Sequence, residues 1–372
     1  MVSRADLNSV TAPLEQATSL PPACYTQAAV FEQEKTRLFY REWICVAREE
    51  QIATAGDFVC VDVADQPLVI VRQKDGSIEA LSSVCLHRAM PICSGSGNAS
   101  SFSCPYHLWK YGLDGQLISA PLMDGAEDFH ARDCRLPRAH VETWQGFVFV
   151  NLADEPKPLV PRLSRFDAML AEYELGQTII AATTEFDSPW NWKLLVENFM
   201  EAYHHIGPHS ETLLPVYPAK DSYVVADDDH LWSILHMPGT LHADGEEDFP
   251  PFPKRAGQKN HHLVACVVSP TLIFAANDTS VFWYQLFPHA HNSMTLKIHL
   301  LLRPEVVADE RFAPHIPEVL ELARFVHLED IAVNEGPWRG LHAPMARAGR
   351  LSPLEAAIWH MNQYWVNRVF DA

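Results

Sequence analysis

Short runs that alternate apolar and polar residues dominate the first part of the chain. Residues 58–80 form β-branched runs that Asp-Gln-Pro and Lys-Asp-Gly turns interrupt. This pattern is typical of antiparallel strands joined by hairpins. It continues through residues 111–121 and 146–156, and three prolines within residues 156–161 then end it. We therefore expect a small all-β domain over residues 41–155.

The rest of the chain combines helical and strand-like patterns. Apolar residues recur with helical spacing over residues 190–206, 318–335 and 352–370, and strand-like runs occupy residues 263–278, 280–288 and 294–304. This order favours an α+β domain over residues 156–372, in which helices cover an antiparallel sheet. Residues 28–46 have an amphipathic helical pattern. They predict an N-terminal helical segment, residues 1–40, that packs on this larger domain.

Length and charge narrow the class of protein. The 372 residues fit two domains with substantial cores. A formal net charge of −19 argues against a nucleic-acid surface, which needs clustered Lys and Arg. The chain starts without a continuous apolar stretch, and the longest apolar run, residues 263–276, is too short to span a bilayer. We expect a soluble, cytoplasmic protein whose eight cysteines are reduced or bind metal.

Two short segments each combine one cysteine and one histidine. They are Cys85-Leu86-His87-Arg88 and Cys104-Pro105-Tyr106-His107. A zinc site is the main alternative, but structural zinc sites usually space their paired ligands two to four residues apart, which is wider than Cys-x-His. A Rieske [2Fe–2S] cluster fits better, because two His replace two Cys on one of its irons. Cys93 lies between the segments and is ambiguous, and the other cysteines are expected to be buried core residues.

A second group of histidines occurs in the sequence Tyr-His-His-Ile-Gly-Pro-His, residues 203–209. On an uninterrupted helix, His205 and His209 would form the natural i, i+4 metal pair. However, Gly207-Pro208 interrupts the helix before His209, because Pro disfavours α-helical backbone at the preceding residue. Spacing alone therefore leaves open whether His204 or His205 accompanies His209.

A carboxylate that could complete such a site occurs on the predicted helix 318–335. At about 100° per residue, the apolar residues of this helix fall within one sector about 100° wide. Asp330 is the charged residue in that sector, whereas Glu318, Glu321, Glu329 and Glu335 lie outside it. A carboxylate on a buried face costs several kcal/mol unless it is paired or binds a metal. We therefore expect Asp330 to be either a metal ligand or a paired structural residue.

The two cysteine–histidine segments and the later histidine segment together resemble the Rieske non-haem iron oxygenases. The family pattern runs Cys-x-His-Arg, then Cys-Pro-Tyr-His-Gly-Trp, and this chain has Leu108 where Gly is usual. The resemblance implies an N-terminal all-β Rieske [2Fe-2S] domain and a C-terminal catalytic domain that holds mononuclear Fe(II). It also implies the following ligands: Cys85, His87, Cys104 and His107 for the cluster, and His204, His209 and Asp330 for the iron.

The resemblance extends to residues beside the iron. It places at Glu201 a carboxylate that bridges the iron site to a cluster histidine of the neighbouring subunit, in a head-to-tail homotrimer. Asn198 matches the family's Asn beside the iron ligands, and His205 is left as a pocket residue. No Gly-x-Gly-x-x-Gly fingerprint for a dinucleotide is present. The implied partner is a separate reductase that uses NAD(P)H, with a ferredoxin as a possible intermediary.

The expected function is that of a terminal oxygenase component. The pattern is closest to the homotrimeric branch that acts on carnitine, choline, glycine betaine and stachydrine. It therefore favours hydroxylation or N-demethylation of a small methylated ammonium compound, with oxidation of an aromatic compound as the alternative. A Rieske electron-transfer protein is the alternative from a different class, but it would lack the iron triad. Phe282, Trp283, Tyr284 and Phe287 could line a cavity, form a cage for a methylated cation, or pack the sheet.

Overall fold

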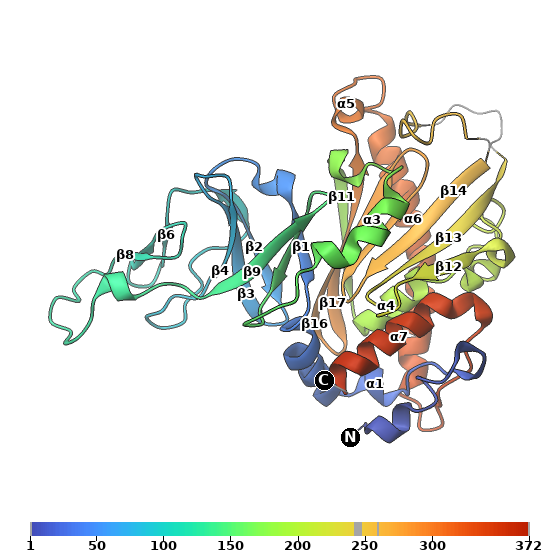
Figure 1. Ribbon diagram of the computed structural model, residues 1–372, viewed down its shortest axis with the longest axis horizontal. Coiled ribbons are helices and arrows are strands. Elements are labelled where there is room, and N and C mark those ends of the chain that lie inside the picture. Colours follow the sequence, from blue (N-terminus) through green and yellow to red (C-terminus); the bar gives the residue numbers. More distant parts are fainter. Residues whose placement is uncertain (1, 242–247, 259, 371–372) are drawn as a thin grey trace. The chain divides into compact units, whose positions relative to one another are not determined.

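The computed structural model describes residues 2–241, 248–258 and 260–370, and the chain divides into two compact units (Figure 1). One unit is Phe39–Leu163, and the other combines Met1–Leu38 with Ser164–Ala372. The domain boundaries expected at residues 40 and 155 remain predictions, and the compact units divide instead after Leu38 and Leu163.

The smaller unit is built from antiparallel strands. Its larger sheet has the order β1-β10-β9-β4-β3-β2-β5, and a small sheet has the order β6-β7-β8. The strands are β1 (Ile44–Arg48), β2 (Asp57–Val63), β3 (Gln66–Arg72), β4 (Ile78–Ser82), β5 (Ser96–Asn98), β6 (Phe102–Ser103), β7 (Lys110–Tyr111), β8 (Leu117–Ser119), β9 (Arg138–Trp144) and β10 (Phe147–Asn151). The hairpins expected within residues 58–80 are therefore confirmed.

The core of the smaller unit reaches the two cysteine–histidine segments. Strand β3, which lies between β4 and β2, buries four consecutive residues, Leu68–Val71, so both of its faces are covered. Cys85 and Cys104 are buried in the same apolar cluster as Val69, Val71 and Trp109. The apolar core therefore holds both cysteine–histidine segments in place through their buried cysteines.

The larger unit contains one antiparallel sheet and several helices. The sheet order is β11-β17-β16-β15-β14-β13-β12. Its strands are β11 (Ile179–Ser188), β12 (Tyr223–Ala226), β13 (Trp232–Leu241), β14 (Asn260–Val268), β15 (Leu272–Ala276), β16 (Val281–Ala290) and β17 (Ser293–Leu302). The helices are α1 (Ala23–Thr26), α2 (Ala28–Glu34), α3 (Ser164–Leu170), α4 (Trp192–Phe199), α5 (Pro304–Val307), α6 (His315–Leu341) and α7 (Ala356–Val369). This confirms the predicted α+β class.

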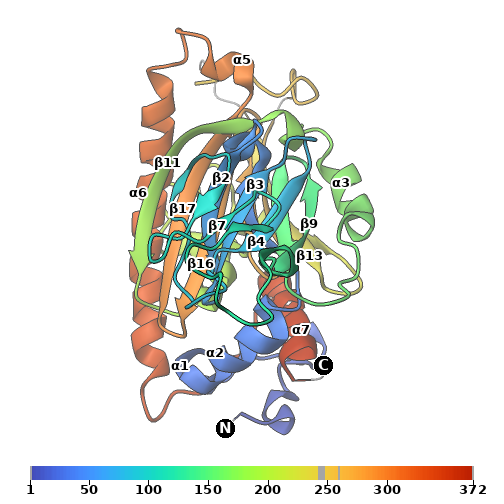
Figure 2. The same ribbon diagram turned by 90° about the vertical axis from the view of Figure 1, so that its left-hand side faces the viewer.

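Two helices lie on opposite sides of this unit. The long helix α6 runs beside β11 and also contacts α4 (Figure 2). Helix α7 contacts β12 and β13 near the other edge of the sheet (Figure 1). Among the described residues, none of the helices is both long enough and apolar enough to cross a lipid bilayer.

A buried ion pair joins three helices of the larger unit. Glu34 ends α2 and Lys193 lies in the first turn of α4, and neither side chain is exposed to solvent. The Nζ of Lys193 donates to Oε1 of Glu34 over 2.5 Å, and the indole nitrogens of Trp192 and Trp365 donate to the same carboxylate. Trp365 belongs to α7. One carboxylate therefore holds α2, α4 and α7 together.

We expect Glu34→Gln to lower the free energy of unfolding by about 3–5 kcal/mol, because it leaves the Lys193 ammonium buried without its counter-charge. Denaturant unfolding, followed by circular dichroism, measures the change. The double variant Glu34→Gln/Lys193→Met removes both charges and should be more stable than the single variant. Glu32→Gln is the control, because the side chain of Glu32, which pairs with Lys35, is 65% exposed, and its substitution should change stability by less than about 1 kcal/mol. An equal effect of both single substitutions would contradict the assigned role of the buried pair.

Candidate metal centres and active-site cavity

The four donors of the Rieske-type segments lie on two loops of the smaller unit. Cys85 and Cys104 are buried, whereas His87 and His107 are exposed. The Nδ1 atoms of the two histidines are 3.1 Å apart. His87 also stacks on Trp109, and the hydroxyl of Tyr111 lies 3.2 Å from the Cys85 sulfur and accepts a hydrogen bond from the Leu86 amide. Two buried thiols beneath two converging imidazoles form a donor set that fits a Rieske cluster.

The two loops have the same backbone hydrogen-bond pattern. The Cys85 amide donates to the Met90 carbonyl and the Ala89 amide donates back to the Cys85 carbonyl; Cys104, Trp109 and Leu108 repeat this arrangement. In each loop the fourth residue after the cysteine has a left-handed backbone, with φ of 54° at Ala89 and 60° at Leu108. A left-handed residue suits Gly, which explains why Gly is usual where this chain has Leu108.

The histidine segment follows a shorter helix than expected. Helix α4 ends at Phe199, and a separate 3₁₀ turn covers Tyr203–Ile206. The expectation that one helix continues to residue 206 was therefore wrong. Met200 leaves helical geometry as the C-cap, so the chain turns before it reaches Glu201. The i, i+4 rule for a continuous helix therefore does not apply to these histidines, because the helix has already ended before Gly207-Pro208.

This turn brings His204, His209 and Asp330 together. One ligand atom from each residue lies within 4.8 Å of the others. Nε2 of His209 is 2.9 Å and Nε2 of His204 is 3.6 Å from Oδ1 of Asp330. Asn198, near the end of α4, donates to the same Asp330 oxygen. The three side chains could therefore hold a metal ion.

Two further carboxylates orient the histidines. Glu201 accepts hydrogen bonds from the backbone amide and the Nδ1 of His204, at 2.9 and 2.7 Å. Glu329 accepts from Nδ1 of His209 at 2.7 Å and from the Thr212 hydroxyl. With Nδ1 protonated in both rings, each Nε2 presents a lone pair toward Asp330. A shared cation satisfies such facing acceptors, so this site fits a mononuclear metal.

The contact of Glu329 with His209 was not predicted from the sequence. The helical projection placed it outside the apolar sector, and this excluded it as a ligand but did not identify it as the partner of His209. The sequence contained one indication of a role for Glu329 at the site, namely that it directly precedes Asp330. His205 is buried, and its Nδ1 lies 3.4 Å from the carbonyl oxygen of Tyr217. Burial and the neighbouring His204 lower the pKa of His205 to about 4, so it faces the cavity as a neutral ring.

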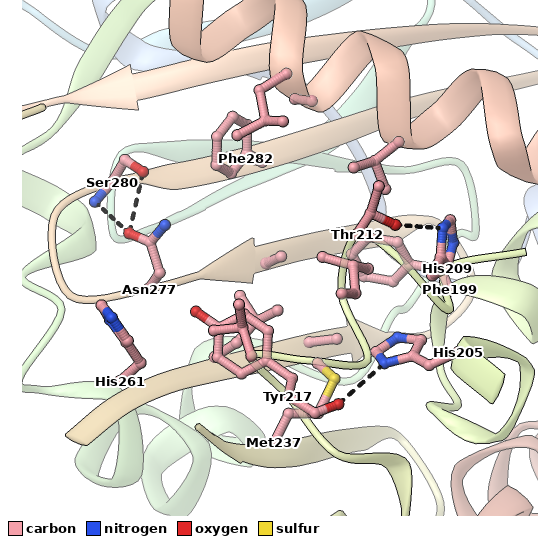
Figure 3. A pocket seen from close by; sticks show the side chains of 18 of the residues that line it. Phe199, His205, His209, Thr212, Tyr217, Met237, His261, Asn277, Ser280 and Phe282 are labelled. Atoms are coloured by element: carbon pink, nitrogen blue, oxygen red, sulfur yellow. Dashed lines mark hydrogen bonds between the residues drawn. The ribbon is translucent and has the colours of Figure 1, made fainter. Parts of the chain in front are cut away.

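A cavity of about 670 Å³ opens beside the three potential ligands. Its wall includes Val319, Leu322, Ala323 and Val326, the same α6 residues that form a sector with Asp330. The sequence predicted that this sector is a buried face of the helix. In the structure the sector mainly lines a cavity, and Leu322 is 60% exposed. Figure 3 shows Phe282, Phe199 and Tyr217 around the cavity.

The aromatic residues of β16 divide between the two faces of the sheet. Phe282 and Tyr284 line the cavity, whereas Trp283 is fully buried and stacks on His299 on the other face. Phe287 does not line the cavity. Alternate residues of β16 therefore have the two expected roles: some line the cavity and others pack the sheet.

Comparison with known proteins agrees with these two donor sets. A family model for the ring hydroxylating alpha subunit (catalytic domain) matches residues 179–371, and one for the Rieske [2Fe-2S] domain matches residues 42–137. The chain belongs to the ring hydroxylating alpha subunit family. It has a Rieske domain followed by the catalytic domain of a non-haem iron oxygenase.

Individual relatives of this alpha subunit carry more specific names. The glycine betaine monooxygenase oxygenase subunit of Chromohalobacter salexigens is 37% identical over 52% of this chain and 44% of its own length. The carnitine monooxygenase oxygenase subunit of Acinetobacter baumannii is 34% identical over 60% of this chain and 59% of its own length. The match thus spans about half of each curated relative. A solved structure of the quaternary ammonium Rieske monooxygenase CntA with L-carnitine has a TM-score of 0.80 at 25% identity, over 97% of both chains.

We expect Leu108→Gly to raise the free energy of unfolding of the alpha subunit's Rieske domain. Glycine relieves about 1–2 kcal/mol of left-handed strain, and this gain exceeds its added entropy in the unfolded chain. The thermal midpoint of the cluster-loaded protein, followed by its visible absorption, measures the change. Leu86→Gly is the matched control, because Leu86 lies in the equivalent loop without a positive φ and should lower the midpoint. A drop of equal size in both variants would show that the Leu108 side chain matters more than its backbone.

Proposed function

We propose that this alpha subunit is the terminal oxygenase component of a multicomponent system that oxidises a small methylated ammonium compound with dioxygen. The reaction is hydroxylation or N-demethylation. The observation that carries the proposal is the convergence of His204, His209 and Asp330 beside a 670 Å³ cavity in a chain that also has a Rieske domain. A Rieske electron-transfer protein has no use for the second site.

We assign Cys85, His87, Cys104 and His107 as ligands of the [2Fe–2S] cluster and His204, His209 and Asp330 as ligands of Fe(II). When bound, these groups supply single electrons and a site for dioxygen activation. The chain's own residues set the geometry: Glu201 and Glu329 orient the two imidazoles, and Asn198 holds one oxygen of Asp330. His205 lies on the cavity wall, and its Nδ1 is directed to the carbonyl oxygen of Tyr217.

Electrons must come from outside this chain, because it has no dinucleotide fingerprint. We assign this role to a separate reductase that uses NAD(P)H, with or without a ferredoxin. Glu201 is 9% exposed and both of its oxygens contact His204, yet a carboxylate has about four acceptor sites and can accept one more donor. The proposed donor is a cluster histidine of a neighbouring subunit in a head-to-tail homotrimer, an arrangement that closes into a ring.

The cavity supports a cationic substrate. Five carboxylate residues line it, together with the aromatic rings of Phe199, Tyr217, Phe249, Phe282 and Tyr284. Aromatic faces and nearby carboxylates both attract a methylated ammonium group. The names of the relatives, glycine betaine and carnitine monooxygenase subunits, support the same substrate class.

The test is turnover of a panel of methylated ammonium compounds and aromatic acids, supplied with NADH and a reductase, with formaldehyde and product mass as readouts. We expect formaldehyde or a hydroxylated product from at least one methylated cation. Turnover of aromatic compounds alone would replace the proposal with its alternative. Asp330→Ala should abolish turnover and remove about one of three irons per chain, while the visible spectrum of the cluster persists.

The contact between Glu329 and His209 makes a separate prediction. We expect Glu329→Gln to weaken Fe(II) binding about 10–100-fold, because the amide is a weaker acceptor for Nδ1 of His209 and lowers the basicity of its Nε2. Equilibrium dialysis of the cluster-loaded protein measures the dissociation constant. Glu335→Gln is the control on the same helix, because Glu335 is exposed and should leave the constant unchanged. Unchanged binding in Glu329→Gln would mean that Glu201, Asn198 and the ligands alone fix the site.

A further inference from the structure

The cavity has a second polar end, away from the three potential iron ligands. Figure 3 shows His209 and His205 on one side and Asn277, Ser280 and His261 on the other, with the rings of Phe282 and Tyr217 between them. All of these residues line the same cavity. A substrate whose reacting group lies beside the iron ligands therefore extends its other end toward Asn277.

The amide of Asn277 is held in one orientation. Its Oδ1 accepts four hydrogen bonds, from the backbone amides of Thr279 and Ser280 at 3.0 and 2.8 Å and from their hydroxyls at 3.3 and 3.1 Å. Backbone amides can only donate, so the oxygen must be the atom that faces this turn. The Nδ2 then faces the cavity (Figure 3). It makes no hydrogen bond within the described residues.

This orientation makes the far end of the cavity a hydrogen-bond donor. An Asn side-chain nitrogen offers two N–H groups and no acceptor. A donor that already has its direction fixed loses little entropy when a ligand binds. The matching substrate group is an oxygen acceptor: a carboxylate, a carbonyl, a hydroxyl or an ether.

The charge of the cavity wall favours a neutral oxygen acceptor over a carboxylate as the substrate group. Among the described residues that line the cavity, Glu201, Glu211, Asp248, Asp278 and Asp330 are acidic and none is Lys or Arg. A substrate carboxylate would therefore be desolvated near like charges, which is unfavourable.

One of these five acidic residues is paired with an arginine. Arg255 is 7% exposed, and its Nε and Nη2 both donate to Oδ1 of Asp278, at 2.9 and 2.6 Å. Its Nη1 donates to Glu172 at 3.1 Å. All three nitrogens of Arg255 are thus bound to protein carboxylates, so Arg255 neutralises Asp278 and leaves the other four acidic residues of the wall.

We propose that Asn277 is a specificity-determining residue that donates a hydrogen bond to a neutral oxygen acceptor of the substrate. The substrate class is then a methylated ammonium compound with a hydroxyl, ether or carbonyl at its far end, in place of the free carboxylate of glycine betaine and carnitine. This inference rests on the proposed function and narrows it. It also uses the size of the cavity, because 670 Å³ holds more than a methylated ammonium group alone.

The experiment uses three trimethylammonium compounds of equal chain length that end in a methyl ketone, which only accepts hydrogen bonds, in a carboxylate or in an alkyl group. Each is titrated into the iron- and cluster-loaded enzyme by calorimetry, and formaldehyde formation is measured with NADH and a reductase. Wild-type enzyme should bind the ketone about tenfold more tightly than the alkyl compound, as expected for one well-oriented hydrogen bond. The carboxylate should bind more weakly than the ketone.

The decisive variant is Asn277→Asp. Aspartate keeps an oxygen for the four hydrogen bonds of the turn and replaces the cavity-facing NH₂ by a second oxygen. The preference for the ketone over the alkyl compound should fall about tenfold, while the cluster spectrum, iron content and thermal midpoint stay as in the wild type. Ser280→Ala is the control within the same turn: it removes one of the four bonds to Oδ1, leaves Nδ2 in place, and should keep the preference.

The outcomes distinguish the inference from the proposed function. If a methylated cation is oxidised but the carboxylate is the best ligand, the inference is wrong and the proposed function stands. The same conclusion follows if Asn277→Asp keeps the wild-type preference. If none of the ammonium compounds is oxidised, the proposed function is wrong and the inference falls with it. A loss of preference in Ser280→Ala equal to that in Asn277→Asp would assign the effect to the turn as a whole.

Discussion

The buried pair of Glu34 and Lys193 is the interaction on which the catalytic unit depends. The Lys193 ammonium lies within 5.3–5.5 Å of the ring centroids of Tyr25, Trp192 and Trp365, and the Glu34 carboxylate binds it directly. Burying one of these charges alone would cost several kcal/mol, so the pair forms only when α2, α4 and α7 are all in place. Since α4 carries Asn198 and leads directly to Glu201 and His204, the position of the proposed iron site follows from a charge pair that does not touch it.

In the proposed iron site, both histidines are oriented in the same way. Glu201 and Glu329 each bind an Nδ1 atom, which fixes the tautomer and turns both Nε2 atoms toward Asp330. The two carboxylates come from elements far apart in sequence, one from the turn after α4 and one from α6. Asn198 and Asn334 connect α4 to α6, because Asn334 donates to Oδ1 of Asn198 at 3.4 Å and Asn198 donates to Oδ1 of Asp330 at 3.2 Å. The same contacts that join α4 to α6 therefore orient the ligands.

The sequence contained much of the fold and part of the site. The Cys-x-His segments, the hairpins and the helical sector with Asp330 could be predicted because local spacing determines them. The end of α4 at Phe199 could not, since nothing local in residues 196–200 stops a helix and the segment that follows is held to α6 by the contacts of His209. The role of Glu329 also depends on a contact with another segment, because Glu329 must meet His209. Asn277 bonds within its own turn, at Thr279 and Ser280, but that this turn borders the cavity depends on the fold of the sheet. Side-chain period alone does not show which partner an exposed carboxylate or amide will find.

The cavity itself follows from a difference between the two faces of one sheet. On one face, Phe274 and Trp232 pack against Phe166 of α3, and Trp283 fills the same layer. On the other face, Ala265 and Ala275 are directly paired, and their small side chains leave the space that Phe282 and Tyr284 border. An alternating strand pattern predicts two faces of a sheet. It does not show which face borders a cavity, because alanine is also common in packed cores. The open face is the one on which α6 presents Asp330, so the absence of bulk at two alanines places the substrate space beside the metal ligands.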